Sequence, residues 1–279
     1  SALRELGQND WFPARIVRED RQRYRIISER GEGFATVTGK FRSEHESGLD
    51  KPAVGDWVAI SDRGNETLIV EAVLERSSRF VRQEVDRGTS AQVIAANIDF
   101  VFLVCGLDGD FNLRRLERYL TLAQESGVMS VIVLTKADLQ DNVDQYMVQV
   151  RSVARDSAIY SIGFDDGACL DPLRGYFGEG VTIALLGSSG SGKSTLINRL
   201  SGEERMATQA VREVDSRGRH TTTHRELLLL PTGGLIMDTP GMRELQLWAS
   251  AEDVAGAFDD VDEFAANCRF ADCHHDREP

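Results

Sequence analysis

The 279-residue chain has little cysteine, little lysine and no long hydrophobic run. Four cysteines are too few for a disulfide framework in a chain of this length, so we expect a cytoplasmic protein. The longest apolar runs are strand-sized and fall short of the roughly 18 residues that a membrane span needs, which predicts no membrane partner. The first residues show no signal-peptide pattern, and the missing initiator Met indicates a trimmed amino terminus.

Positive charge in this chain is nearly all arginine, because the 32 basic residues include only Lys40, Lys51, Lys136 and Lys193. Lysine is normally common, so each remaining lysine is a candidate for a specific role. The net charge of −13 argues against nonspecific nucleic-acid binding by the whole surface. The acidic excess lies after residue 87, whereas residues 14–42 are rich in arginine. The amino-terminal part is therefore the candidate RNA-facing surface, although a solvated arginine face explains the same pattern.

Two patterns of expected secondary structure divide the chain. Five short strands predict a small closed barrel, either of the oligonucleotide-binding (OB) type or SH3-like: Phe12–Val17, Tyr24–Ser28, Phe34–Thr38, Asp56–Ile60 and Leu68–Val73. From about residue 97, strands alternate with helices, which predicts a mostly parallel sheet covered on both faces. The tail from Trp248 is acidic and helical in character. We predict a barrel at residues 1–82, an α/β domain at 83–247 and a helical tail at 248–279.

A glycine-rich segment at residues 187–194 matches the phosphate-binding pattern G-x-x-x-x-G-K-[ST]. An apolar strand is expected before it and a helix after it, which is the context that the pattern requires. Backbone N–H groups of such a loop bind phosphate oxygens, Lys193 would reach the β- and γ-phosphates, and Ser194 would bind Mg²⁺. The predicted nucleotide-binding residues here are Gly187, Ser188, Ser189, Gly190, Ser191, Gly192, Lys193, Ser194 and Thr195.

A second nucleotide element, Thr135-Lys136-Ala137-Asp138, follows an expected strand and is similar to the GTPase N/T-K-x-D motif. The Asp138 carboxylate can accept hydrogen bonds from guanine N1–H and N2–H₂, a donor pair that adenine lacks. The Lys136 stem would lie along the base, and Ser161 is expected in a second, weaker base-contact loop. This element precedes the phosphate loop, the reverse of the order in ordinary GTPases. A circular permutation explains that order.

Asp238-Thr239-Pro240-Gly241 resembles the switch-II element of GTPases. Asp238 would hold Mg²⁺ and the Gly241 N–H would contact a γ-phosphate. Between the phosphate loop and this element, residues 217–223 offer Thr221 or Thr222 as a further Mg²⁺ ligand, and we prefer Thr222.

Met242 stands where Ras-like enzymes place a water-orienting Gln, and an apolar side chain cannot orient water. If hydrolysis occurs, His220 is the candidate catalytic residue, since an imidazole can exchange protons near neutral pH. A histidine that merely occupies a polar loop is the alternative.

A C-x₄-C-x-H pattern near the carboxyl end supplies Cys268, Cys273 and His275. Two thiolates and an imidazole suit tetrahedral Zn²⁺. A structural zinc site has four ligands, and this pattern supplies only three clear ones unless His274 also binds. We expect one Zn²⁺ whose fourth ligand is absent from this chain, or else cysteines and histidines that are incidental.

The order of these motifs resembles the circularly permuted, ribosome-small-subunit-dependent GTPase family (RsgA, also called YjeQ). The most specific pieces are Gly218–Thr222, Val54–Val58, Ala96–Asp99 and Cys268–His275. The resemblance implies an OB-type barrel, a permuted GTPase domain and a zinc-binding helical tail. It also implies a slow GTPase that is stimulated by the small ribosomal subunit and acts in late 30S maturation through rRNA binding and GTP-dependent release.

The same resemblance implies that His220 is the catalytic histidine and that the fourth zinc ligand is a Cys just beyond Pro279. Thr135 departs from the family's usual Asn, but the guanine-reading Asp138 is intact. We expect a monomer that uses GTP/GDP, Mg²⁺ and Zn²⁺. Met242 leaves open a nucleotide-sensing RNA-binding module with negligible hydrolysis, and the phosphate loop alone would also suit an ATP-using kinase or ATPase.

Overall fold

The computed structural model describes residues 10–20, 23–45, 47–64, 67–84, 90–109, 111–154, 156–164, 170–202, 226–231 and 233–238. The helical character expected of the tail from Trp248 falls outside these residues. None of the helices formed by the described residues is both long and apolar enough to cross a bilayer.

Five strands form a closed barrel at the amino-terminal end: β1 (Phe12–Asp20), β2 (Arg23–Ser28), β3 (Gly31–Val37), β4 (Trp57–Ser61) and β5 (Leu68–Val73). They follow the order β1-β2-β3-β5-β4, and β4 pairs back onto β1. Only the β3–β5 pairing among these is parallel. A short helix, α2 (Gly39–Glu44), connects β3 to β4 and is capped by Thr38, whose hydroxyl accepts from the Phe41 N–H. The five strands lie where the sequence predicts them, and their closure is consistent with an OB-type barrel.

A hairpin that the sequence did not predict follows the barrel. Strands β6 (Arg79–Glu84) and β7 (Ser90–Ala96) pair in an antiparallel sheet of their own. Much of β6 is charged or polar, so it lacks the apolar alternation by which strands are usually recognised. Buried Phe80 and Ile94 fix the hairpin to the rest of the molecule. The expected boundary between residues 82 and 83 falls inside β6, and the division into domains stays a prediction.

The remainder of the described chain forms a sheet in the order β10-β9-β8-β11-β13-β12. Its strands are β8 (Phe100–Gly106), β9 (Met129–Thr135), β10 (Ala158–Ser161), β11 (Thr182–Leu186), β12 (Glu226–Leu229) and β13 (Leu235–Asp238). All neighbours are parallel except the β12–β13 hairpin, so the mostly parallel sheet is confirmed.

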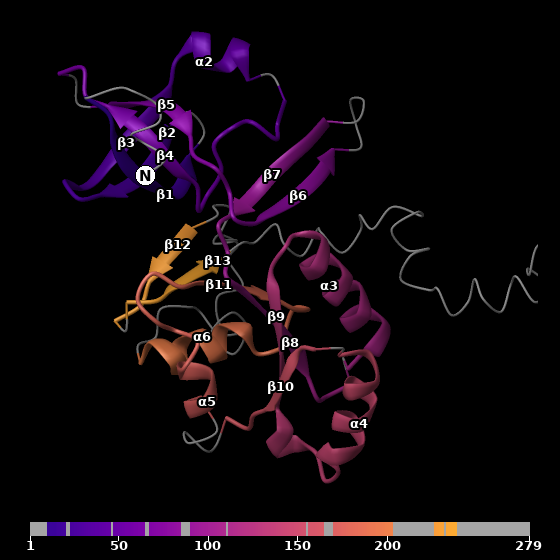
Figure 1. The fold of residues 1–279 in the computed structure, drawn as a ribbon. Coiled ribbons are helices and arrows are strands. Elements are labelled where there is room, and N and C mark those ends of the chain that lie inside the picture. Colours follow the sequence, from indigo (N-terminus) through magenta and orange to yellow (C-terminus); the bar gives the residue numbers. More distant parts are fainter. Residues whose placement is uncertain are drawn as a thin grey trace, which may run out of the picture.

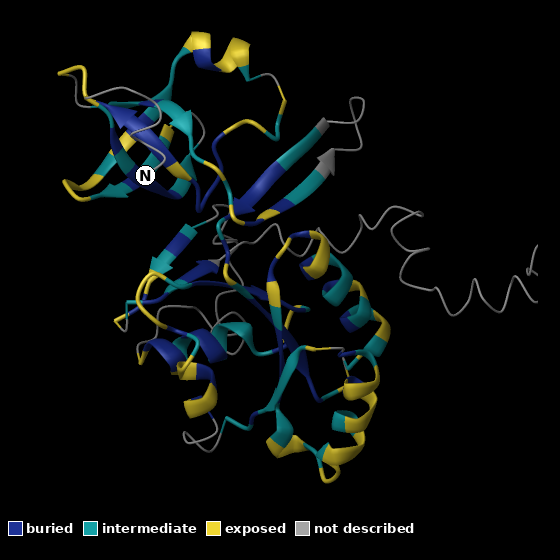
Figure 2. Ribbon diagram, viewed as in Figure 1, coloured by how far each residue is buried: buried dark blue, intermediate teal, exposed yellow. Residues whose placement is uncertain are grey.

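Helices cover both faces of this sheet (Figure 1). One face carries α3 (Leu113–Glu125) and α4 (Val143–Val153), and the other carries α5 (Asp171–Arg174) and α6 (Lys193–Ser201). Neighbouring residues of a strand face opposite sides, so Leu103 of β8 packs with the α3 side and Phe102 with the α6 side. Both faces are therefore apolar, and the central strands are the most deeply buried part of the domain (Figure 2).

The barrel and the α/β domain are joined by a strand pairing as well as by the chain. Strand β12 pairs with β1 of the barrel in antiparallel register, with Arg18 opposite Glu226. The barrel's buried side chains and those under α3 belong to one contiguous apolar core, which includes Ile16 and Leu103. The two units thus share a packed interface rather than a linker alone.

Candidate functional site

The carboxyl ends of four strands meet at one edge of the α/β sheet, because the parallel strands β9, β8, β11 and β13 are neighbours. The carboxyl ends of parallel strands lie at the same edge, where open α/β sheets bind their ligands. Thr135 closes β9, the loop from Gly187 follows β11, and Asp238 closes β13 opposite Glu226. The structure therefore brings the two predicted nucleotide elements together in space despite their reversed order in the chain.

The backbone of the phosphate loop depends on glycine. Gly190 and Gly192 have φ of +82° and +93°, a region that side chains other than glycine rarely adopt. A Cβ at Gly187 would lie 2.3 Å from the Val104 carbonyl oxygen and 2.7 Å from Ser191 Oγ. The loop curls tightly enough to turn its N–H groups toward a ligand. Ser189 and Gly190 form its exposed tip.

Lys193 begins helix α6 and folds back over the phosphate loop. Its Nζ donates to the carbonyl oxygens of Gly187, at 2.7 Å, and Ser188, at 2.5 Å. The ammonium is thereby held over the loop. Ser194 and Thr195 occupy the first turn of α6, whose amino-terminal N–H groups favour an anion.

The T-K-A-D segment is held by contacts to two neighbouring loops. Lys136 adopts a left-handed conformation, with φ of +61°, and its Nζ contacts the Asp108 carboxylate beyond β8. Asp138 Oδ1 accepts from the Phe164 N–H at 3.2 Å, in the loop after Ser161 of β10. A Cβ at Gly163 would lie 3.1 Å from the same oxygen. The backbone after β10 therefore orients the Asp138 carboxylate.

Thr135 joins the base element to the phosphate loop. Its side chain has no exposed surface, and Oγ1 donates to the Ser191 carbonyl at 2.6 Å, across 56 positions of sequence. A Cβ at Gly192 would lie 3.2 Å from both this hydroxyl and the Phe164 ring. The phosphate loop, the base element and the loop after β10 therefore pack as one unit.

These loops fit a phosphorylated guanine nucleotide. The curled glycine backbone and the Lys193 amine suit phosphate, and the oriented Asp138 carboxylate suits the guanine donor pair. Ser194 and Asp238 lie at the same edge and carry oxygens of the kind that Mg²⁺ prefers.

Several predicted site residues lie outside the described part of the chain: His220, Thr221, Thr222, Gly241, Cys268, Cys273 and His275. The backbone of Asp238 is described, and its side chain is not. No group of three or more metal-ligating side chains occurs among the residues that the structure describes.

Sequence reasoning missed Asp108 and Phe164. Asp108 follows strand β8 and Phe164 follows β10, so both lie at the nucleotide edge. An acidic residue after a strand beside the phosphate loop is the same signal that predicts Asp238 as a candidate, so Asp108 could have been predicted in the same way. Phe164 belongs to no motif, and only the fold places its ring against Gly192.

A second polar cluster lies where the barrel meets the α/β domain. Asp56 is fully buried, accepts from the Ala53 N–H at 2.8 Å and forms two hydrogen bonds of 2.7 Å with Arg76. Burial raises the pKa of Asp56, and the Arg76 guanidinium opposes that shift. Arg76 also donates to the backbone carbonyls of Leu49 and Lys51. One side chain thus ties the segment after β5 to the barrel.

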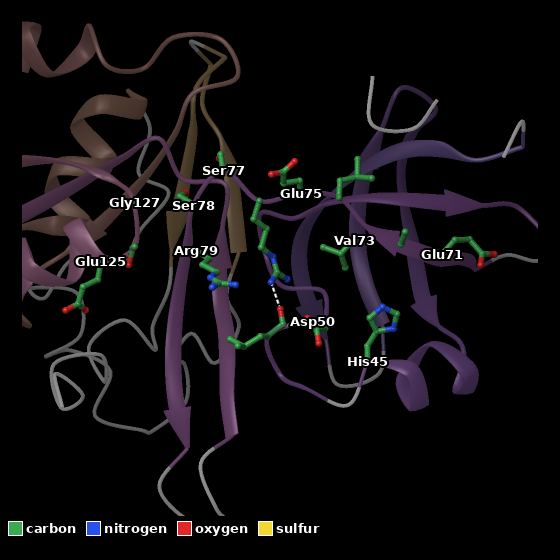
Figure 3. A pocket seen from close by; sticks show the side chains of 15 residues that line it. His45, Asp50, Glu71, Val73, Glu75, Ser77, Ser78, Arg79, Glu125 and Gly127 are labelled. Carbon is green, nitrogen blue, oxygen red and sulfur yellow. Dashed lines mark hydrogen bonds between the residues drawn. The ribbon is translucent and has the colours of Figure 1, made fainter. Parts of the chain in front are cut away.

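This cluster borders a groove of about 590 Å³ between the two units. Figure 3 shows His45 and Glu71 on the barrel side and Glu125 and Gly127 on the other, with Arg79 between them. Acidic and basic side chains are mixed along the groove, so it presents no field of one sign to a ligand.

Comparisons with known proteins agree with the geometry of the nucleotide edge. A family model described as RsgA GTPase matches residues 73–248. The small ribosomal subunit biogenesis GTPase RsgA of Opitutus terrae is 44% identical, in a match that covers 100% of this chain and 78% of that protein. Its namesake RsgA 1 of Oceanobacillus iheyensis is 45% identical, with 98% and 78% covered.

Two solved structures are similar in fold. YjeQ from Thermotoga maritima matches with a TM-score of 0.65 and 25% identity, covering 96% of this chain and 88% of that chain. YloQ, described as a circularly permuted GTPase, matches with a TM-score of 0.62 and 23% identity, covering 97% and 86%. The circular permutation that the motif order predicts is confirmed.

Proposed function

The chain belongs to the RsgA GTPase family and hydrolyses GTP, and from that premise we propose that it acts in biogenesis of the small ribosomal subunit. The support is that both similar proteins are named small ribosomal subunit biogenesis GTPases. In this proposal the small subunit stimulates hydrolysis, and GTP turnover releases the protein late in 30S maturation. The single observation that carries the nucleotide site is the contact of Thr135 with Ser191, because it holds the base element against the phosphate loop.

The proposed roles at the nucleotide follow from the geometry of the edge. Asp138 accepts from guanine, the Lys136 stem lies along the base, and the loop from Gly187 with Lys193 binds the phosphates. Bound Mg²⁺ would neutralise charge that develops on the phosphate oxygens. Ser194 and Asp238 are its expected ligands among the residues with a described backbone.

The proposal includes two further residues that lie outside the part of the chain that the structure describes. Thr222 completes the Mg²⁺ ligands, and His220 orients or deprotonates the attacking water in place of the Gln that Met242 replaces. If the His220→Ala variant keeps full stimulated turnover, His220 has no part in the mechanism.

The barrel is the proposed rRNA-binding surface. The Arg23 guanidinium lies 4.1 Å from the centre of the Phe34 ring, which is 37% exposed, and Arg30 lies 3.7 Å from that of Phe12. Phe12 itself is buried, so Phe34 is the exposed ring of the two. An exposed aromatic ring with arginines nearby is suited to unstacked bases and to phosphates, which single-stranded RNA offers together. This surface supports RNA binding in a protein whose net charge is −13.

The tail is proposed to hold one Zn²⁺ through Cys268, Cys273 and His275, because two thiolates and an imidazole form a donor set that favours this ion. We also propose that the protein works as a monomer in the cytoplasm, where its ribosomal partner is found.

The test measures phosphate release from GTP with and without purified small ribosomal subunits. We expect slow intrinsic turnover that rises more than about tenfold with subunits at low salt. The Lys193→Met variant is the nucleotide-site control and should lose both rates. Turnover that subunits leave unchanged would overturn the ribosomal assignment, and ATP that competes as well as GTP would overturn guanine specificity.

A further inference from the structure

One arginine of the barrel reaches across the junction to the strand that carries the phosphate loop. Arg15 lies on β1 and is 7% exposed. Its Nη2 donates to Thr182 Oγ1 at 2.8 Å and to the Asn97 carbonyl at 3.0 Å, and its Nε donates to the Gly55 carbonyl at 3.3 Å. Arg15 and Thr182 are 167 positions apart, so this contact exists only in the folded protein.

Thr182 is the first residue of β11, and the phosphate loop begins directly after the last. Its side chain has no exposed surface, so its hydroxyl has no water to replace Arg15. The backbone at this position is held from the other side by Asp99, whose Oδ2 accepts from the Thr182 N–H at 2.7 Å and whose N–H donates to the Thr182 carbonyl at 2.9 Å. The start of β11 is thereby fixed between a barrel residue and the segment before β8.

The backbone around Arg15 is closely packed and leaves little freedom. Asn97 has φ of +54°, an uncommon conformation outside glycine, and its side chain bonds the Ser77 N–H at 3.0 Å and the Gly55 carbonyl at 3.0 Å. Gly55 has φ of +93°, and a Cβ there would lie 2.1 Å from the Ala96 carbonyl oxygen. Such conformations persist where surrounding contacts over-determine them, so the contacts of this junction hold its backbone in place.

Arg15 also reaches the surface of the barrel. Trp57 lies opposite Arg15 in the β1–β4 pairing, and the guanidinium lies 5.5 Å from the centre of its ring. The ring is 42% exposed, which leaves one part of it available to a partner. A partner that covers Trp57 would remove water from this cation–π contact and strengthen it. The same planar guanidinium bonds Thr182. A shift of the guanidinium toward the Trp57 ring would therefore also change its hydrogen bond with Thr182.

We propose that Arg15 is a positioning residue that couples occupancy of the barrel surface at Trp57 to nucleotide binding, through Thr182 and strand β11. The proposal rests on the proposed function, in which the small ribosomal subunit meets the barrel. Coupling of this kind is reciprocal. The factor by which the subunit changes the affinity for GTP equals the factor by which GTP changes the affinity for the subunit.

The experiment measures that factor with a non-hydrolysable GTP analogue and purified small subunits, in both directions. The wild-type factor should exceed about fivefold, and Thr182→Val and Arg15→Lys should bring it below about twofold. Both variants should bind the analogue without subunits as the wild type does. Thr182→Ser keeps the hydroxyl and should keep the coupling. Arg63→Lys is the matched control, because Arg63 is a barrel arginine that pairs with Glu71 at the surface.

The outcomes separate this inference from the function on which it rests. A wild-type factor of one together with unstimulated turnover defeats the proposed function. A wild-type factor that survives in Thr182→Val and Arg15→Lys overturns the role of Arg15 alone. If these two variants fail to fold, Trp57→Ala decides the question, because its ring is partly exposed. Coupling that this variant retains in full also overturns the proposal.

Discussion

Strand β11 has two ends with opposite properties. At its start, the barrel junction buries charged and polar groups and gives them protein partners, as with Arg15 on Thr182. At its end, the nucleotide edge holds the Lys193 amine on two carbonyl oxygens of the phosphate loop. A bound phosphate would replace these oxygens as the partner of the amine. A glycine that leaves no room for a Cβ lies near each end of the strand: Gly55 at the junction and Gly187 at the edge.

The difference separates residues that hold the fold from residues that hold the ligand. Removing one partner of a buried, fully paired charge leaves the other charge without solvation, and folding free energy is lost. Removing a group that waits for a ligand costs binding and leaves folding nearly intact. Variants at the junction should therefore destabilise the protein, and variants at the edge should weaken nucleotide binding.

The largest effect is expected at the junction from Arg76→Met. It leaves the buried Asp56 carboxylate without its bidentate partner, so the free energy of unfolding should fall by about 3–5 kcal/mol, measured by urea denaturation. Arg63→Met is the control, since Arg63 is 56% exposed and pairs with Glu71 at the surface. That change should cost less than about 1 kcal/mol. Equal losses in the two variants would erase the contrast between buried and exposed pairs.

The same variant makes a signed prediction about pH. Burial raises the pKa of Asp56 and Arg76 opposes it, so the loss of Arg76 moves that pKa further above its value in the unfolded chain. The folded variant then binds a proton more readily than the unfolded one. Its stability relative to wild type should recover as the pH falls through the raised pKa and decline as the pH rises. Adding Asp56→Asn should remove this dependence.

The two ends also differ in how far the sequence could predict them. Lys193 and Asp138 lie in short motifs whose chemistry depends on neighbouring residues, so spacing alone is enough to predict them as candidates. The contact of Arg15 with Thr182 links a barrel strand to a distant strand of the other unit, and no local pattern encodes it. The Val54–Val58 and Ala96–Asp99 runs are among the most specific pieces of the family resemblance, but only the fold shows that Gly55 and Asn97 meet.

The next largest effect is expected at the edge from Gly187→Ala. The new Cβ would overlap the Val104 carbonyl oxygen, which belongs to the central strand β8 and cannot move aside cheaply. GTP affinity should fall more than about 100-fold, which corresponds to about 3 kcal/mol, measured by calorimetric titration. Gly39→Ala is the control, because nothing lies within 4 Å of a Cβ there. An alanine at 187 that binds GTP normally would show that the loop can reshape.

Thr135 tests whether folding and ligand binding depend on different residues. It lies at the nucleotide edge, yet its side chain is buried and paired within the protein, as at the junction. Its hydroxyl is fully buried and donates to the Ser191 carbonyl, which Thr135→Val would leave without that donor. The loss of one buried hydrogen bond should lower stability by about 1 kcal/mol and GTP affinity by roughly fivefold, since the same bond positions both loops. Thr135→Ser keeps the donor and should restore both quantities. Thermal unfolding measured beside GTP titration separates the two effects. If stability falls while GTP affinity is unchanged, Thr135 acts in folding as the junction residues do. The nucleotide site would then contain residues that stabilise the fold beside residues that bind the ligand.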